Sequence, residues 1–183
     1  MAPSASAPPS SRPPEAELAI VGAGPVGLYA AYYAGFRGLS TVVLETLPMV
    51  GGQIAAFYPN TPIFDVPGFT SVTGAELVDR LHRQASAFPI AFRLGEEVTG
   101  VAREGDLLRV ETRRADGAAQ DGHDGSTALR VRALLVAAGI GSFAPQRIPD
   151  PAIAAFEGRG LTYLPPPPEA VRGENVLVLG GTE

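Results

Sequence analysis

The 183-residue sequence contains no cysteine, and its 14 basic residues are all arginines. Without cysteine, the chain can form no disulfide, no thiolate nucleophile, no iron–sulfur ligand set and no redox-active Cys-x-x-Cys pair. Without lysine, it has neither a Schiff-base amine nor the lysine that a Walker-type phosphate loop requires. These absences exclude several kinds of covalent and redox chemistry, and they leave the cellular compartment open.

Long apolar runs and clustered positive charge are also missing. No uninterrupted apolar run approaches the roughly 18 residues of a membrane helix, and no basic start followed by an apolar core marks a secretory signal. We therefore expect a cytoplasmic protein without a membrane span. The net charge is −5 and the arginines are scattered, which argues against nucleic-acid binding. His82 and His123 lie far apart without a partner at ligand spacing, so we expect surface histidines and no metal site.

The chain does contain a glycine-rich turn between a predicted strand and a predicted helix. The apolar run Leu18 to Val21 is typical of a buried parallel strand, and helix-forming residues follow the turn as far as Arg37. Between them, Gly22 permits the tight turn, Gly24 lets the backbone approach a pyrophosphate, and Gly27 lets the helix pack closely on the strand. This order of elements predicts a dinucleotide-binding unit of the Rossmann type.

Two further features predict what this turn binds. The first N–H groups of the helix, near Val26 to Leu28, would face phosphates with the positive end of the helix dipole behind them, and Pro25 suits the first helical turn. Glu45 ends the next predicted strand 21 residues after Gly24, close to the spacing at which an acidic residue meets ribose hydroxyls. Because a carboxylate repels a 2′-phosphate, we expect FAD or NAD here and not NADP. The alternative is a glycine-rich turn without a ligand.

A second glycine pair, Gly51-Gly52, stands just before Gln53. Such a pair is not expected in a plain NAD domain, and it would let the chain pass close to a larger ligand. This favours FAD. The alternative is an ordinary loop in which Tyr58 and Phe64 are core aromatics.

The remaining elements predict an α/β fold with a small antiparallel insertion. A capping box, Thr73-Gly-Ala-Glu76, begins an amphipathic helix that ends before Pro89. We expect short strands over 91–94, 97–101, 107–112 and 128–132. The last three would form an antiparallel β-meander across one face of a parallel sheet, and 132–141 would be a central parallel strand whose carboxyl end lies against the ligand.

Composition divides the chain into four parts. Residues 1–16 are a Pro/Ser-rich tail that we expect to be disordered, and 17–146 would be an FAD-binding domain that lacks its C-terminal portion. Residues 147–175 are a Pro-rich connection. Residues 176–183 would begin a truncated NAD(P)-binding domain, present only as its first strand, 176–179.

Several stretches resemble the ferredoxin–NADP(+) reductases of the thioredoxin-reductase-like type, in the pyridine nucleotide-disulfide oxidoreductase superfamily. They are the glycine turn and helix from Ile20 to Gly35, Leu47-Pro-x-x-Gly-Gly-Gln53, Tyr58-Pro59, Asp65 to Phe69, Glu97-Val98, and Val136-Ala-Ala-Gly-x-Gly-x-Phe-x-Pro145. The resemblance extends over about 18–181. It implies a Rossmann-like FAD-binding domain with a parallel sheet, crossover helices and a small β-meander.

The resemblance also implies roles for individual residues. Glu45 would bind the adenosine ribose, Gln53 and Tyr58 would lie along the ribityl chain and the isoalloxazine, and Val98 would meet the adenine through its backbone. Phe143 would lie beside the flavin. The expected cofactor-binding set is Gly22, Gly24, Pro25, Val26, Gly27, Glu45, Gly52, Gln53, Tyr58, Val98, Ala138, Gly139 and Phe143. No catalytic side chain is expected, because the flavin performs the chemistry and the protein orients it.

In the family that the chain resembles, NADPH gives a hydride to FAD, which passes single electrons to ferredoxin or flavodoxin, and the full-length relatives are homodimers. The chain departs from this pattern: it shows nothing of the NADPH fingerprint beyond Gly180-Gly181-Thr182, and it lacks the later strand that returns to the flavin domain. We therefore expect an FAD-dependent NAD(P)H oxidoreductase if the missing portion is supplied. The alternatives are a non-catalytic or vestigial FAD-binding domain, a thioredoxin-reductase-like protein without redox cysteines, and a plain NAD-binding module.

Overall fold

The computed structural model describes residues 15–115, 126–141, 147–163, 166 and 168–180. The chain divides into two units, 1–142 and 143–183. The tail expected over 1–16 lies outside the described residues as far as residue 14, and the first strand begins at Ala16.

One six-stranded sheet organises the first unit. Its strands, in the order β5-β2-β1-β8-β7-β6, change from parallel to antiparallel at β8. The parallel ladders β1–β2, β1–β8 and β2–β5 confirm the predicted Rossmann-like arrangement. The strands are β1 (Ala16–Val21), β2 (Thr41–Glu45), β5 (Ala91–Leu94), β6 (Glu96–Glu104), β7 (Leu107–Arg114) and β8 (Ser126–Val136).

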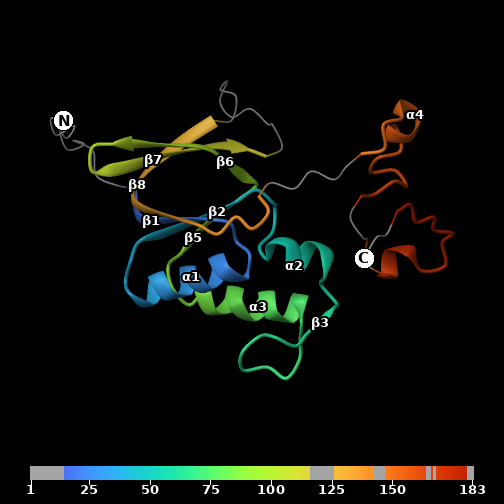
Figure 1. Cartoon of the computed structure of the whole chain (residues 1–183), viewed down its shortest axis with the longest axis horizontal. Coiled ribbons are helices and arrows are strands. Elements are labelled where there is room, and N and C mark those ends of the chain that lie inside the picture. Colours follow the sequence, from blue (N-terminus) through green and yellow to red (C-terminus); the bar gives the residue numbers. More distant parts are fainter. Residues whose placement is uncertain (1–14, 116–125, 142–146, 164–165, 167, 181–183) are drawn as a thin grey trace, which may run out of the picture. The chain divides into compact units, whose positions relative to one another are not determined.

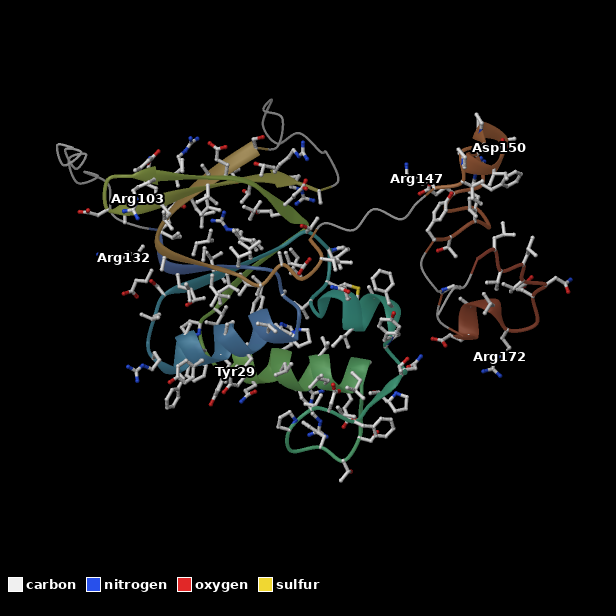
Figure 2. All side chains as sticks on the ribbon, in the orientation of Figure 1. Tyr29, Arg103, Arg132, Arg147, Asp150 and Arg172 are labelled. Carbon is white, nitrogen blue, oxygen red and sulfur yellow. The ribbon has the colours of Figure 1, made fainter. Side chains whose placement is uncertain are left out.

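The first unit has three layers, with the β-meander on one face of the parallel strands and two helices on the other (Figure 1). The helices are α1 (Pro25–Phe36) and α3 (Gly74–Ala85). In Figure 2, Tyr29 marks the helical layer and Arg103 marks the meander. The layout confirms the expectation of a meander that crosses one face of the sheet.

A separate apolar core fills each of the two spaces between the layers. Beneath the meander, its residues Val110, Leu129 and Val131 pack with Val42 and Leu44 of the parallel strands. On the other side, the core joins the sheet to the helices through Ile20, Ala23, Ala31, Val43 and Ala85. Because both faces of β1 and β2 are covered, these strands are apolar almost throughout, as is typical of buried parallel strands.

β8 corrects one detail of the prediction. We expected two strands, 128–132 and 132–141, but a single strand runs through Ser126–Val136. Its first half pairs antiparallel with β7, and its second half pairs parallel with β1. The sequence pattern changes from alternating to continuously apolar within β8 because the first half is covered on one face and the second half lies between two layers.

The sequence also did not predict a short helix, α2 (Gly52–Phe57), which follows β2. It begins at a glycine, which is a poor helix former, and it holds no buried residue. The segment therefore lacks both a helix-favouring first residue and an apolar face, the two patterns by which a helix is recognised in a sequence. Two short strands, β3 (Pro62–Ile63) and β4 (Val72–Thr73), then form a small antiparallel pair before α3.

The capping box at the start of α3 is half formed. The Thr73 hydroxyl accepts the N–H of Glu76 at 3.3 Å, as predicted. The Glu76 carboxylate, however, accepts from Arg80 at 2.7 Å, so this side chain does not reach back to Thr73. The predicted apolar face is confirmed, since Leu77, Val78 and Ala85 are buried.

The second unit contains little regular structure in its described part. A one-turn helix, α4 (Pro151–Ala154), is capped by the Asp150 carboxylate, and a 3-10 helix spans Pro168–Val171. The Tyr163 hydroxyl accepts the N–H of Ile148 at 3.0 Å. Residues 176–179, expected as a strand, belong to no ladder, and their side chains are 57–81% exposed.

Candidate dinucleotide-binding site

The first glycine turn joins β1 to α1, and two of its glycines are required by close backbone approaches. Gly22 has a φ of 101°, and a Cβ on it would overlap the Ala137 carbonyl oxygen at the end of β8. A Cβ on Gly27 would overlap the carbonyl oxygen of Gly22. Gly22 therefore turns the chain and Gly27 lets α1 begin against that turn, which are the roles that the spacing predicts.

Gly24 differs from Gly22 and Gly27 in having open space beside it. Its φ and ψ of −71° and −179° suit any residue, and apart from Gly24 itself and its two chain neighbours no described atom lies within 4 Å of the place where a Cβ would be. A glycine with neither conformational nor packing need for its missing side chain marks a place where a ligand can approach the backbone.

The N-terminus of α1 offers backbone donors beside Gly24. No side chain caps this helix, and Pro25 occupies its first turn, where no donor is needed. The N–H of Leu28 donates to the Gly24 carbonyl at 2.9 Å and is therefore not available, contrary to our expectation. The groups before it, those of Val26 and Gly27, are the helical donors that an anion could engage.

Glu45 stands at the end of β2, directly beside the glycine turn. Its Oε2 accepts the N–H of Ala23 at 2.7 Å, and its Oε1 accepts the N–H of Leu47 at 2.9 Å. The side chain is 8% exposed. Glu45 thus fixes the shape of the turn, and each oxygen keeps a lone pair that could accept from a ribose hydroxyl. Its contact with the adenosine ribose stays a prediction.

The second glycine pair packs against the first turn. The N–H of Gly51 donates to the Ala23 carbonyl at 2.8 Å, and a Cβ on Gly52 would lie 3.2 Å from the Cα of Gly24. Both glycines have positive φ, 114° and 55°. The close approach that these two glycines make is therefore to the glycine turn, and it brings the start of α2 to the site. Their approach to a larger ligand stays a prediction.

Gln53, the residue after this pair, reaches the loop that follows β8. A Cβ on Gly139, whose φ is 60°, would lie 2.9 Å from the Gln53 Nε2. The structure thus joins four predicted positions from three separate segments: Gly24 in the first turn, Gly52 and Gln53 at the start of α2, and Gly139 in the loop after β8. Sequence spacing could not show this proximity, because it depends on the order of the strands.

A pocket of about 190 Å³ opens beside Glu45 at the carboxyl ends of β1 and β2 and beside the loop after β8. Strand ends of this kind are where doubly wound folds bind ligands. The lining residues are Val21, Gly22, Leu44, Glu45, Thr46, Glu96, Glu97, Val98, Ala138 and Gly141. Four of the predicted cofactor-binding residues, Gly22, Glu45, Val98 and Ala138, therefore share one pocket.

Two predicted residues are placed neither with the glycine turns nor with this pocket. The Tyr58 side chain is 57% exposed and contacts the ring of Phe57, with centroids 6.2 Å apart, and it does not line the pocket. Phe143 lies outside the described residues. Their roles beside the flavin stay predictions.

Sequence reasoning missed Glu96, which lies in the pocket wall at the start of β6. Alternation along the strand places it on the same face as Val98, which packs against the core beneath the meander. That alternation was the available indication. It was obscured because the predicted strand began at residue 97, one residue after Glu96.

In the described part of the chain, no group of three His, Cys, Asp or Glu residues is placed to hold a metal ion. The His82 ring lies edge-on to Phe92 at 5.2 Å. His123 lies outside the described residues. Among the described helices, none has the length and apolar character to cross a bilayer.

The fold and the glycine turn define the class of the domain. Residues 20–85 match the model of the NAD(P)-binding Rossmann-like domain family. Solved structures with a similar fold include the thioredoxin reductase of Lactococcus lactis, at a TM-score of 0.56 and 22% identity over 80% of this chain and 42% of that one. The atypical thioredoxin reductase TRi of Desulfovibrio vulgaris Hildenborough is 31% identical, with a TM-score of 0.51, over 79% of this chain and 42% of its own.

The curated relatives narrow this class. The chain is 41% identical to a ferredoxin–NADP reductase of Frankia casuarinae, over 90% of this chain and 47% of that protein. It is 43% identical to the ferredoxin–NADP reductase of Saccharopolyspora erythraea, over 92% of this chain and 48% of that protein. The chain is thus homologous to ferredoxin–NADP reductases with a thioredoxin-reductase-like fold, which confirms the resemblance, and it spans about half the length of the relatives it matches.

Proposed function

We propose that the chain is the FAD-binding portion of an NAD(P)H-dependent flavoprotein oxidoreductase of the ferredoxin–NADP reductase type. The observation that carries this proposal is the open space at Gly24, beside the uncapped N-terminus of α1 and the carboxylate of Glu45. A pyrophosphate fits donors at a helix N-terminus, and a ribose fits a carboxylate acceptor.

Different residues of this chain would bind different parts of the cofactor. The N–H groups of Val26 and Gly27 would hold the pyrophosphate, with Gly22, Gly24 and Pro25 shaping the turn, and Glu45 would bind the adenosine ribose. Val98 would meet the adenine. Gly52, Gln53, Tyr58, Ala138, Gly139 and Phe143 would lie along the remainder of the cofactor.

The chemistry in such a protein is that of its flavin, which accepts a hydride and releases electrons singly. The work of this chain is to bind and orient the cofactor, and no side chain here needs to act as acid, base or nucleophile. NADPH, or NADH, would be the hydride donor where a second nucleotide-binding domain is supplied, and ferredoxin or flavodoxin would be the acceptor. We further propose a cytoplasmic protein that forms a homodimer.

The test is the visible spectrum of the purified protein, followed by addition of NADPH without oxygen. We expect a yellow protein with flavin absorbance bands, and loss of those bands on reduction once the second domain is present. A colourless protein that takes up no added FAD would contradict the proposal. A yellow protein whose flavin resists NADPH in a chain that carries both domains would favour a non-catalytic FAD-binding domain.

A further inference from the structure

The helix α1 is apolar on every side. Its twelve residues, Pro25–Phe36, include only Pro, Val, Gly, Leu, Ala, Tyr and Phe, and none of them carries a charge. A helix of this composition is normally enclosed by the rest of its protein. Gly27, Leu28, Ala31 and Ala34 are buried and account for the face that the domain itself covers. The opposite face needs a different explanation.

Large apolar side chains follow one another along this opposite face. They are Val26, Tyr29, Tyr33 and Phe36, spaced by three or four residues, which places them on one side of a helix. Their exposed fractions are 69%, 55%, 52% and 62%. The rings of Tyr33 and Phe36 stack with centroids 6.3 Å apart, and Figure 2 shows Tyr29 on the side of α1 away from the sheet. These four residues, which we call the α1 stripe, form an apolar surface on the helix.

The α1 stripe is as large as the largest apolar patch of a typical monomer. With about 200 Å² as the full area of each residue, it exposes roughly 450–500 Å², and patches of roughly 300–600 Å² are often functional. Two such stripes in contact would remove roughly 900–1,000 Å² from water, close to the roughly 1,000 Å² that a specific interface needs. Residues of α3, which packs beside α1, would add to this area. The size therefore suits a contact between two copies of the chain.

The charges around the stripe also favour a second copy over an unlike partner. An unlike partner is usually selected by complementary charge, and α1 has no charge to offer. On the neighbouring α3, Arg80 pairs with Glu76 at 2.7 Å. Arg83 pairs with Asp79 at 3.0 Å, so these four side chains add no net charge. Two copies with a net charge of −5 repel each other overall, and a neutral surface is where they can meet with the least repulsion.

We infer that the α1 stripe packs against the same stripe of a second copy about a two-fold axis. In such an interface both copies contribute the same residues, so a single substitution changes the contact twice. The inference rests on the proposed function for the homodimer alone, to which it gives a contact surface. It requires no bound cofactor.

The experiment measures the dimer dissociation constant of the whole chain by sedimentation equilibrium. Tyr33→Glu places a carboxylate on each of the two facing stripes. It should raise the dissociation constant at least about a hundredfold, because each charge loses water and meets a like charge. The matched control is Phe64→Glu, since Phe64 is 72% exposed and lies directly after β3, outside α1. This control should stay within about twofold of the wild-type constant.

A second variant separates a lost contact from a lost fold. Tyr33→Arg alone should dissociate the dimer as Tyr33→Glu does. An equal mixture of these two variants should associate at least about tenfold more tightly than either variant alone, because opposite charges then face each other. A misfolded chain would not be rescued by its oppositely charged counterpart.

Four results would overturn the inference: a wild-type chain that stays monomeric, a dimer that Tyr33→Glu leaves intact, an equal loss in Phe64→Glu, and a mixture that does not associate. Flavin absorbance of the same samples reports on the cofactor separately. If the dimer forms through the stripe and binds no FAD, the proposed FAD-binding function fails and the interface stands. If a monomer binds FAD, the interface and the homodimer fail and the FAD-binding function stands.

Discussion

At the scale of single residues, the three glycines of the first turn have different physical reasons for being glycine. Gly22 and Gly27 are fixed by the protein itself, since a Cβ on either would overlap a backbone carbonyl oxygen. Gly24 has no such constraint within the described structure. The sequence motif does not distinguish the three glycines. The structure does: Gly22 and Gly27 build the turn, and Gly24 leaves space for a ligand.

This difference predicts opposite outcomes for two identical substitutions. Gly27→Ala should lower the free energy of unfolding by about 3 kcal/mol or more, because a backbone oxygen cannot move aside. Gly24→Ala should leave stability unchanged or raise it by up to about 1 kcal/mol, since its backbone conformation suits alanine. The same variant should weaken FAD binding about tenfold or more.

Urea unfolding monitored by circular dichroism and titration with FAD measure the two properties separately. If Gly24→Ala bound FAD as tightly as the wild type, the space beside Gly24 would not be the place where the cofactor meets the backbone.

Glu45 is expected to matter for stability before any ligand is present. In Glu45→Gln, one backbone N–H, of Ala23 or Leu47, would face the amide NH₂ and lose its acceptor. The loss of a buried hydrogen bond of this kind costs about 1–3 kcal/mol. Chemical denaturation of the ligand-free protein measures it, with Glu97→Gln as the control. An unchanged unfolding midpoint in Glu45→Gln would mean that the carboxylate does not hold the turn.

At the scale of elements, the sequence predicted those whose pattern is local and missed those that depend on distant partners. β1, α1, β2 and α3 follow from runs and periodicities within the segment itself. β8 was divided in two because its surroundings change halfway along, and its continuity cannot be seen without knowing which strands lie beside it. α2 was missed because it has only six residues and begins at Gly52, a poor helix former, and its position comes from packing on the glycine turn.

The site shows the same limit. The residues of the two glycine turns and Glu45 could be named from spacing alone. The contact between Gln53 and Gly139, and the place of Glu96 in the pocket, depend on the strand order and could not be derived from local sequence.

α3 offers a test of the cap that the sequence predicted. Thr73→Ala removes the hydroxyl that accepts the Glu76 N–H, and stability should fall by about 1 kcal/mol. Thr73→Ser keeps the acceptor and should lie within a few tenths of a kcal/mol of the wild type. The denaturant midpoints of the two variants test this expectation. Equal losses of stability in both would show that the methyl group of Thr73 stabilises the protein and that its hydroxyl cap does not.

At the scale of the whole molecule, the first unit holds the sheet, both cores and the pocket. Because FAD would bind the folded state alone, saturating cofactor should stabilise this unit. At a free concentration about 100 times the dissociation constant, the expected gain is about 2.7 kcal/mol. Thermal unfolding followed by circular dichroism should show a midpoint several degrees higher with FAD, and a shift at most about half as large in Gly24→Ala at the same concentration. An equal shift in both proteins would indicate binding elsewhere.

The central expectation is that this domain binds the ADP portion of FAD through the β1–α1 turn and Glu45. Parallel titration of the protein with FAD and with FMN, which has the same isoalloxazine and lacks the AMP portion and its pyrophosphate link, tests this most directly. We predict that FAD binds at one molecule per chain and that FMN binds at least about a hundredfold more weakly, a difference of roughly 2.7 kcal/mol. FMN binding as tightly as FAD, or no binding of FAD at all, would contradict this prediction.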